Sequence, residues 1–278
     1  MNTTTAGNAM SQLDQPIDTT AAEAYEEHMV PGMFLHWTEL AVRIAAPQPG
    51  EHVLDVACGT GIGARLAARA LGSSGKVVGL DVDAGVVEVA RRVAAQSGTP
   101  IEWHCANALK MPFDDDTFDL CLCLQGIQFF PDRAAGLSEM RRVLKPSGRL
   151  VASIWGPLEF NKGHVAVVHA LEAQHVDASP AKRACSFADP EDIRETVARA
   201  GFTHIDLRTE DGVTQFASMQ SFIDAMTIGS PSTRHAVARL PEGGRDIFVK
   251  DVCATLEPYL KGGRLAYPMR THILVARP

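Results

Sequence analysis

The chain has 278 residues, of which 46% are hydrophobic and 21% charged, a balance typical of a globular protein with one full core and insertions. Its 26 Lys and Arg residues against 33 Asp and Glu residues leave a formal charge of -7, which argues against nucleic acid as the main ligand. Apolar runs stay below the roughly 18 residues of a membrane helix, and the N-terminus lacks a secretory pattern. We therefore expect a cytoplasmic protein without membrane insertion.

The first part of the chain predicts a mobile tail over residues 1–20 and two short helices between residues 20 and 46. Apolar side chains recur there at helical spacing, and Pro31 with Gly32 separates the two helices. These helices precede the first core strand, so they must pack onto the finished sheet. We expect residues 1–45 to form a tail and a lid.

From residue 46 onward, strands and helices alternate in a way that predicts an α/β fold with a Rossmann-like, doubly wound sheet. Strands are expected at residues 53–57, 76–80, 101–105, 118–124, 149–155 and 203–207, and helices at residues 63–71, 85–97, 133–144 and 189–200. Residues 267–276 are expected to return as the antiparallel last strand of a mostly parallel, seven-stranded sheet. Helical cap segments at about residues 157–186 and 212–264 interrupt this core of residues 46–278, and we place them over the carboxyl edge of the sheet, where ligands bind.

A glycine-rich loop follows the first predicted strand. Gly59, Gly61 and Gly63 lie ahead of an alanine-rich helix, where the backbone can turn sharply and approach a ligand closely. Asp81 ends the next strand, a position from which a carboxylate can hold both hydroxyls of a ribose. With Ala64 the same spacing also satisfies the NAD fingerprint, so the loop alone leaves the type of cofactor open.

Three further features favour a ligand that carries a cation. Asp55 lies inside the first strand, where its carboxylate suits an amino group better than a pyrophosphate. Asn107 and Ala108 follow the third strand and offer a side-chain amide and backbone amides to an adenine edge. Residues 114–120 then lead into the fourth strand without a second loop of the nicotinamide type.

These motifs resemble the class I S-adenosylmethionine-dependent methyltransferases, in particular the small-molecule branch that includes the ubiquinone and menaquinone biosynthesis enzymes. The motifs are VLDVACGTG at 53–61, VVGLDVD at 77–83, NALKMPFDDDTFDL at 107–120 and RRVLKPSGRL at 141–150, and the resemblance is strong over about residues 46–155. It implies S-adenosylmethionine as cofactor, Asp81 on the ribose, and Asn107 beside the adenine, where the family usually has aspartate.

The predicted cofactor contacts combine the pattern and the resemblance. Tyr25 and Trp37 are included because the N-terminal helices of the family usually cover the cofactor. Gln125 is included because a polar residue just past an apolar strand is costly unless it serves the ligand edge. The full set is Tyr25, Trp37, Asp55, Ala57, Gly59, Gly61, Asp81, Val82, Asn107, Ala108 and Gln125.

The resulting hypothesis is S-adenosylmethionine-dependent, in-line methyl transfer to a small, partly apolar molecule. Such a displacement needs alignment and exclusion of water rather than a covalent residue, so no catalytic residue is assigned. The histidines fall in no motif, and His164 is given a surface or core role. An NAD(P)-dependent oxidoreductase and a cofactor-binding module without turnover stay open as alternatives. We expect no metal site, and the sequence leaves a homodimer open.

Overall fold

A mixed sheet organises the chain in the computed structural model, which describes residues 17–96, 98 and 100–278, so that the predicted tail lies largely outside the described residues. The strand order is β3-β2-β1-β4-β5-β8-β6, with β7 paired to β8. The strands are β1 (His52–Val56), β2 (Lys76–Asp81), β3 (Glu102–Cys105), β4 (Phe118–Leu124), β5 (Leu144–Trp155), β6 (Thr203–Phe216), β7 (Leu260–Lys261) and β8 (Arg264–Arg277). Strands β1 to β5 pair in parallel, and β8 runs antiparallel to both β5 and β6. The predicted fold class is confirmed, and the two-residue β7 adds an eighth strand through a hairpin with β8.

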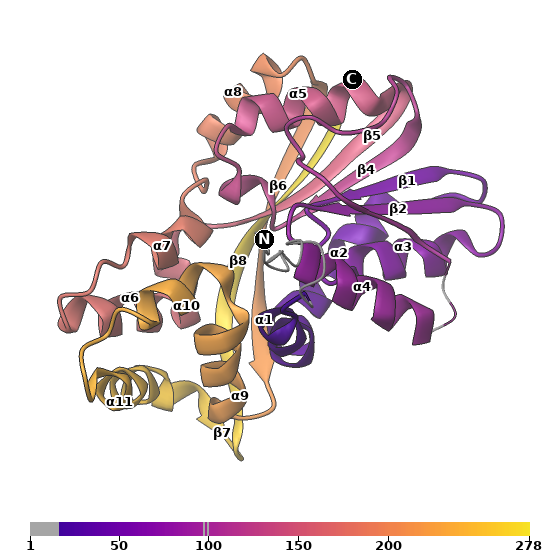
Figure 1. Cartoon of the computed structure of the whole chain (residues 1–278). Coiled ribbons are helices and arrows are strands. Elements are labelled where there is room, and N and C mark those ends of the chain that lie inside the picture. The colour runs from indigo at the N-terminus through magenta and orange to yellow at the C-terminus, as the bar shows by residue number, and fades with distance from the viewer. Residues whose placement is uncertain (1–16, 97, 99) are drawn as a thin grey trace, which may run out of the picture.

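Helices cover both faces of the sheet (Figure 1). On one face α2 (Leu35–Ala45) and α3 (Ile62–Leu71) pack against side chains such as Leu120 and Leu122 of β4. On the other face α5 (Arg133–Val143) and α8 (Pro190–Arg199) pack against the alternate positions of the same strand, Cys121 and Cys123. Helix α4 (Ala84–Gln96) lies beside β2 and β3. Burial on both faces explains why the core strands are nearly continuous apolar runs.

The N-terminal segment forms one continuous helical rod rather than two separate helices. Helix α1 (Thr20–Ala24), the π-helical η2 (Tyr25–Phe34) and α2 follow one another without a break, and Pro31 lies inside η2. Proline has no N–H to donate within a helix, yet the helical backbone continues through Pro31. The predicted interruption at Pro31-Gly32 is therefore wrong.

A helical cap stands on the extended ends of β6 and β8, away from β1 to β3 (Figure 1). It contains η4 (Leu158–Phe160), α6 (Lys162–Ala173), α7 (Ser179–Lys182), η5 (Arg183–Cys185), α9 (Met219–Asp224), η6 (Ala225–Gly229), α10 (Pro231–Val237), α11 (Gly244–Leu256) and η7 (Glu257–Tyr259). Strand β6 runs on to Phe216, beyond the predicted end at Leu207, because its polar second half pairs with β8 from Ile273 to Leu265. The apolar core of the cap gathers Phe216, Tyr267 and helix side chains into a cluster of its own.

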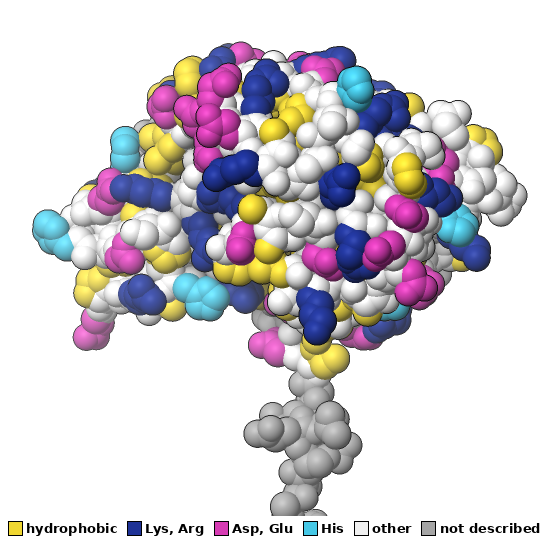
Figure 2. All heavy atoms as spheres, turned by 90° about the horizontal axis from the view of Figure 1, so that it is seen from above, with side chains coloured by type: hydrophobic (Ala, Val, Ile, Leu, Met, Phe, Trp, Pro, Cys, Tyr) yellow, Lys and Arg dark blue, Asp and Glu magenta, His cyan; other side chains and the backbone are white. Residues whose placement is uncertain are grey.

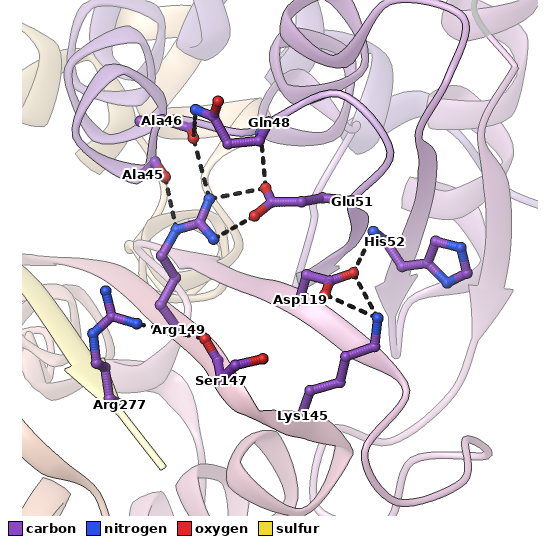
Figure 3. Close-up of polar contacts among 10 residues, drawn as sticks. All are labelled: Ala45, Ala46, Gln48, Glu51, His52, Asp119, Lys145, Ser147, Arg149 and Arg277. Carbon is purple, nitrogen blue, oxygen red and sulfur yellow. Dashed lines mark hydrogen bonds and ion pairs between the residues drawn. The ribbon is translucent and has the colours of Figure 1, made fainter.

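A polar network fixes the amino ends of the strands, at the edge opposite the ligand edge (Figure 3). Arg149 on β5 donates to the two carboxylate oxygens of Glu51 at 2.7 and 2.9 Å and to the backbone carbonyl of Ala45 at 2.8 Å. Lys145 donates to both carboxylate oxygens of Asp119 at 2.8 and 2.9 Å. Two residues of the RRVLKPSGRL motif thus tie α2, β1 and β4 to β5, so that part of the motif serves the fold.

The surface carries both signs of charge. Over the face seen in Figure 2, Lys and Arg side chains are interspersed with Asp and Glu side chains. Within the described ranges, every helix is too short or too polar to cross a membrane.

Candidate functional site

A cleft of about 1420 Å³ opens at the carboxyl ends of the parallel strands. Its core wall follows the residues at or just after the ends of β1, β2, β3 and β4, with Trp155 at the end of β5. The cap forms the opposite wall with residues such as His164 and Thr227. The apolar side chains of Met29 and Met33 close the cleft from η2. The predicted site residues that line it are Tyr25, Ala57, Gly59, Asp81, Val82, Asn107, Ala108 and Gln125.

Asp81 organises the glycine loop from the end of β2. Its Oδ2 accepts the backbone N–H of Gly59 at 3.0 Å, and its Oδ1 accepts the N–H of Asp83 at 3.1 Å. Burial raises the pKa of Asp81, and these two N–H groups oppose the rise. Each carboxylate oxygen keeps a second acceptor site, so the pair can receive two further hydroxyl protons. This geometry suits a ribose.

The N-terminal helical segment reaches the glycine loop through Tyr25 of η2. Gly59 has a φ of +55°, and a side chain there would meet the Tyr25 hydroxyl at 3.5 Å. The Tyr25 ring therefore lies beside the loop backbone at Gly59. Glu26 beside it accepts from the Thr60 hydroxyl at 2.5 Å and from Arg65 Nη2 at 2.7 Å. The start of η2 is therefore docked on the glycine loop and on α3.

Asp55 lies beneath the glycine loop, beside the cleft rather than on its wall. Its side chain is buried, and among the described residues its Oδ2 has no hydrogen-bond partner. Burial raises the pKa of Asp55 to about 7, and the backbone N–H of Ala64 opposes the rise. A Cβ at Gly63 would lie 2.7 Å from Oδ2, so the close approach of α3 to Asp55 depends on glycine. A buried acceptor without a partner is costly unless a cation or a bound molecule completes it.

Two predicted contacts lie elsewhere. Gly61 adopts a φ of +86° and packs against the Trp103 indole, which leaves no room for a side chain. Trp37 is buried in the cap cluster, 6.2 Å from Trp155 between ring centroids, and its indole N–H donates to Thr214 Oγ1 at 3.4 Å. We therefore withdraw both as direct cofactor contacts, since packing accounts for each of them.

The side chains of Asn107 and Gln125 are already engaged within the protein. Asn107 Oδ1 accepts the backbone N–H of Leu109 at 2.9 Å, so the oxygen expected to face adenine also shapes its own turn. Gln125 donates to Thr271 Oγ1 at 3.0 Å and accepts from Gln128 Nε2 at 3.2 Å. Gln125 and Ala57 have φ values of 58° and 54°, in the left-handed region that costs non-glycine residues energy. Such conformations are often held where a ligand binds.

The sequence reasoning missed His164, which the cap brings to the cleft wall. The side chain is 5% exposed and lies beside Trp155, with 6.3 Å between the ring centroids. Burial lowers the pKa of His164 to about 4, so the ring is neutral near pH 7. The one signal in the sequence was its position in a segment expected to fold over the ligand edge.

Comparisons with known proteins agree with this geometry. A model of the ubiE/COQ5 methyltransferase family matches residues 21–175. The 2-phytyl-1,4-naphtoquinone methyltransferase of Synechococcus elongatus is 39% identical over 120 residues, which cover 42% of this chain and 52% of that protein. The demethylmenaquinone methyltransferase of Bacillus subtilis is 39% identical over 116 residues, covering 41% of this chain and 49% of that protein. The chain thus spans about half the length of these relatives.

A solved structure shares the fold across nearly the whole chain. It is Haemonchus contortus phosphoethanolamine N-methyltransferase 2 in complex with S-adenosyl-L-methionine, with a TM-score of 0.60, 19% identity, and coverage of 94% of this chain and 57% of that one. At this identity the likeness concerns the fold alone. The matched family region ends at residue 175, within the first cap segment, so most of the cap lies beyond it.

Proposed function

Because the chain belongs to the ubiE/COQ5 methyltransferase family, we propose that it transfers the methyl group of S-adenosylmethionine to a small, partly apolar molecule. The observation that carries this proposal is the ligand edge itself, where Asp81 holds the Gly59 backbone and keeps acceptor sites free at the mouth of a large cleft. On the other side, η2 supplies apolar side chains, whereas most of the cap residues that line the cleft are polar or charged, among them Arg183, Arg234 and Arg239.

The residues present fit S-adenosylmethionine. Asp81 would receive the ribose hydroxyls, and the backbone around Asn107 and Ala108 would meet the adenine edge. Asp55, beneath the loop with an unpartnered oxygen, would offset the positive charge at the amino acid end. When bound, the cofactor supplies a methyl group activated by a positively charged sulfur. The chain itself aligns the reactants and excludes water, which is most of what an in-line transfer requires.

The acceptor that we propose bears a ring and apolar groups. The two relatives carry names of quinone methyltransferases. In this chain Met29, Met33, Phe34 and Trp155 line the cleft, and flat or aliphatic groups pack well against such side chains. Because the cap lies mostly outside the matched region, it is the part that would set the choice among such acceptors.

The nicotinamide alternative fits the loop less well. A dinucleotide would bring its pyrophosphate to the glycine loop, directly above Asp55. When ionised, this buried carboxylate repels the two phosphates in a region of low dielectric. A cationic ligand is favoured by the same charge.

The test is a comparison of ligands on the purified protein. Calorimetric titration with S-adenosylmethionine, adenosylhomocysteine and NADH should give binding for the first two alone. Incubation with S-adenosylmethionine labelled on the methyl group and 1,4-naphthalenediol, a reduced naphthoquinone, should then move label to the diol. Binding of NADH without binding of adenosylhomocysteine would reject the proposal.

The cellular location and the oligomeric state of the protein are proposals that rest on the sequence. We propose a cytoplasmic protein, and a homodimer is the assembly to test first. Sedimentation of the purified chain at several concentrations, with and without adenosylhomocysteine, measures that assembly directly.

A further inference from the structure

His164 is a buried polar side chain on the cap side of the cleft, and its Nδ1 has no hydrogen-bond partner among the described residues. It projects from the first turn of α6 and is 5% exposed. Among the described residues neither ring nitrogen has a hydrogen-bond partner, and Nδ1 is fully buried. Trp155 lies next to the ring, and both residues line the cleft. Buried polar groups in folded proteins are paired as a rule, so an exception in a cleft points to a missing partner from a ligand.

The start of α6 is held firmly in place, which fixes the position of the imidazole. Buried Asn161 donates to the backbone carbonyls of Gly156 at 2.8 Å and Pro157 at 3.1 Å, and its Oδ1 accepts the N–H of Arg270 at 3.0 Å. This side chain ties the helix to the end of β5 and to β8. Gly163 packs against Tyr267 so closely that a Cβ would lie 2.5 Å from the tyrosine hydroxyl. Rigid support of this kind is what a reacting side chain needs.

The imidazole lies on the cap side of the cleft, across from the glycine loop. Asp81 and Gly59 belong to the core wall, whereas His164 belongs to the cap wall, where the acceptor would lie once the cofactor occupies the core side. We propose that His164 is the general base of the reaction, taking the proton of a hydroxyl group on the acceptor. This inference rests on the proposed methyl transfer.

The step balances in atoms and charge. The acceptor O–H bond breaks, its proton goes to an imidazole nitrogen, and its electron pair forms the new bond to the methyl carbon, at the oxygen or at the ring carbon that shares its charge. In the second case a ring proton then returns to the oxygen. The bond between sulfur and methyl breaks with its electrons on sulfur, which leaves neutral adenosylhomocysteine. The positive charge moves from sulfonium to imidazolium, so the net charge in the cleft is unchanged.

The surroundings keep the ring neutral. Burial lowers the pKa of His164. The ring is therefore neutral near pH 7, as a base must be. Burial makes the free imidazole a weak base, so the transfer depends on the acceptor anion that forms beside the ring and pairs with the imidazolium.

The experiment compares three variants of the full chain. His164→Gln and His164→Ala remove the base, and His169→Gln changes an exposed histidine on the same helix as a control. With labelled S-adenosylmethionine and 1,4-naphthalenediol, the two His164 variants should lose at least a hundredfold in kcat, within the range of general-base catalysis. Their KM for the cofactor should stay unchanged. Added imidazole should restore His164→Ala at least tenfold, which a merely structural role would not allow.

A second readout needs no turnover. In the adenosylhomocysteine complex of the protein with ¹⁵N-labelled histidine, 1,4-naphthalenediol should shift a ring nitrogen resonance of His164, and naphthalene, which lacks hydroxyls, should not. Equal effects of the two probes, or His164 variants with kcat within threefold of the unchanged protein, would overturn the inference. Adenosylhomocysteine affinity separates this outcome from failure of the proposed function: a protein that binds no cofactor loses both, whereas normal binding with an indifferent His164 rejects the base alone.

Discussion

Asp55 shows at the scale of one residue how a binding site is held at the expense of stability. The carboxylate is buried, and burial raises its pKa from 3.8 to about 7. Between these values the unfolded chain has released the proton while the folded chain still holds it. The stabilising contribution of protonated Asp55 to the free energy of unfolding is therefore fully present below pH 3.8. It falls as the pH rises and levels off above about pH 7.

The Asp55→Asn variant should remove this pH dependence. In the ligand-free state, the decrease in Tm between pH 5 and pH 8 should be roughly 5 °C smaller for the variant than for the unchanged protein. About 1 kcal/mol of unfolding free energy corresponds to a few degrees of Tm in a chain of this size. Scanning calorimetry at the two pH values measures it, with exposed Asp114→Asn as a control that should behave like the unchanged protein. A variant with the original pH slope would show that the carboxylate is ionised throughout.

Asp81 gives the second prediction at this scale. We expect Asp81→Ala to lose on the order of a hundredfold or more in adenosylhomocysteine affinity, because two charge-assisted hydrogen bonds to the ribose are worth roughly 1.5 to 3 kcal/mol each. The variant also releases the N–H of Gly59, so part of the loss comes from the loop. Asp81→Asn keeps one acceptor oxygen, so its affinity for adenosylhomocysteine should lie between those of Asp81→Ala and the unchanged protein. Calorimetric titration that finds equal affinity in all three proteins would remove Asp81 from the site.

Among the elements, the end of α2 depends on a side chain far from the cleft. Arg149 and Glu51 are 16% exposed each, and the guanidinium also donates a hydrogen bond to the backbone carbonyl of Ala45 (Figure 3). Arg149→Met should destabilise the fold by about 2 to 3 kcal/mol, since it leaves a largely buried carboxylate without its partner. Urea unfolding measures the loss, and Arg149→Lys should recover part of it. Adenosylhomocysteine affinity should stay unchanged, and a marked loss would mean that this edge and the cleft are coupled.

The strands and helices of the core were predictable because each has a strong local signal. The parallel strands are apolar runs bounded by turns, and the glycine loop with Asp81 located the ligand edge. Predictions from local sequence were wrong where contacts with residues far away in the sequence determine the structure. Strand β6 extends because β8 pairs with it, and the helix continues through Pro31 in a segment whose Met29 and Met33 pack into the cap cluster. Trp37 and His164 have no distinguishing pattern, and the three-dimensional packing alone places one in the core and the other at the cleft.

At the scale of the whole molecule, the N-terminal rod divides into two parts with different partners. Helix α2 packs with α3 on the face of the sheet through Ala41, Val42 and Ala45, so it belongs to the core. Helix α1 and η2 instead line the cleft, with Tyr25 at the glycine loop. We therefore restrict the proposed lid to residues 20–34.

The contact that docks this lid provides a test of closure. Glu26 joins the lid to the core through the Thr60 hydroxyl and the Arg65 guanidinium. The side chain of Glu26 is 21% exposed and that of Arg65 is 13% exposed. If closure is needed for tight binding, Glu26→Gln should weaken adenosylhomocysteine binding about fivefold, the equivalent of about 1 kcal/mol. Exposed Glu27→Gln is the matched control and should bind normally.

Hydrogen exchange then reports the motion itself. In ligand-free Glu26→Gln, amides of residues 21–34 should exchange faster than in the unchanged protein, while those of α2 should not, because α2 is packed on the sheet. Saturating adenosylhomocysteine should slow residues 21–34 again, since a ligand that binds the closed form draws the population towards it. Equal exchange in both proteins, with and without ligand, would mean that α1 and η2 are a fixed wall of the cleft, and that the acceptor must enter from the side of the cap.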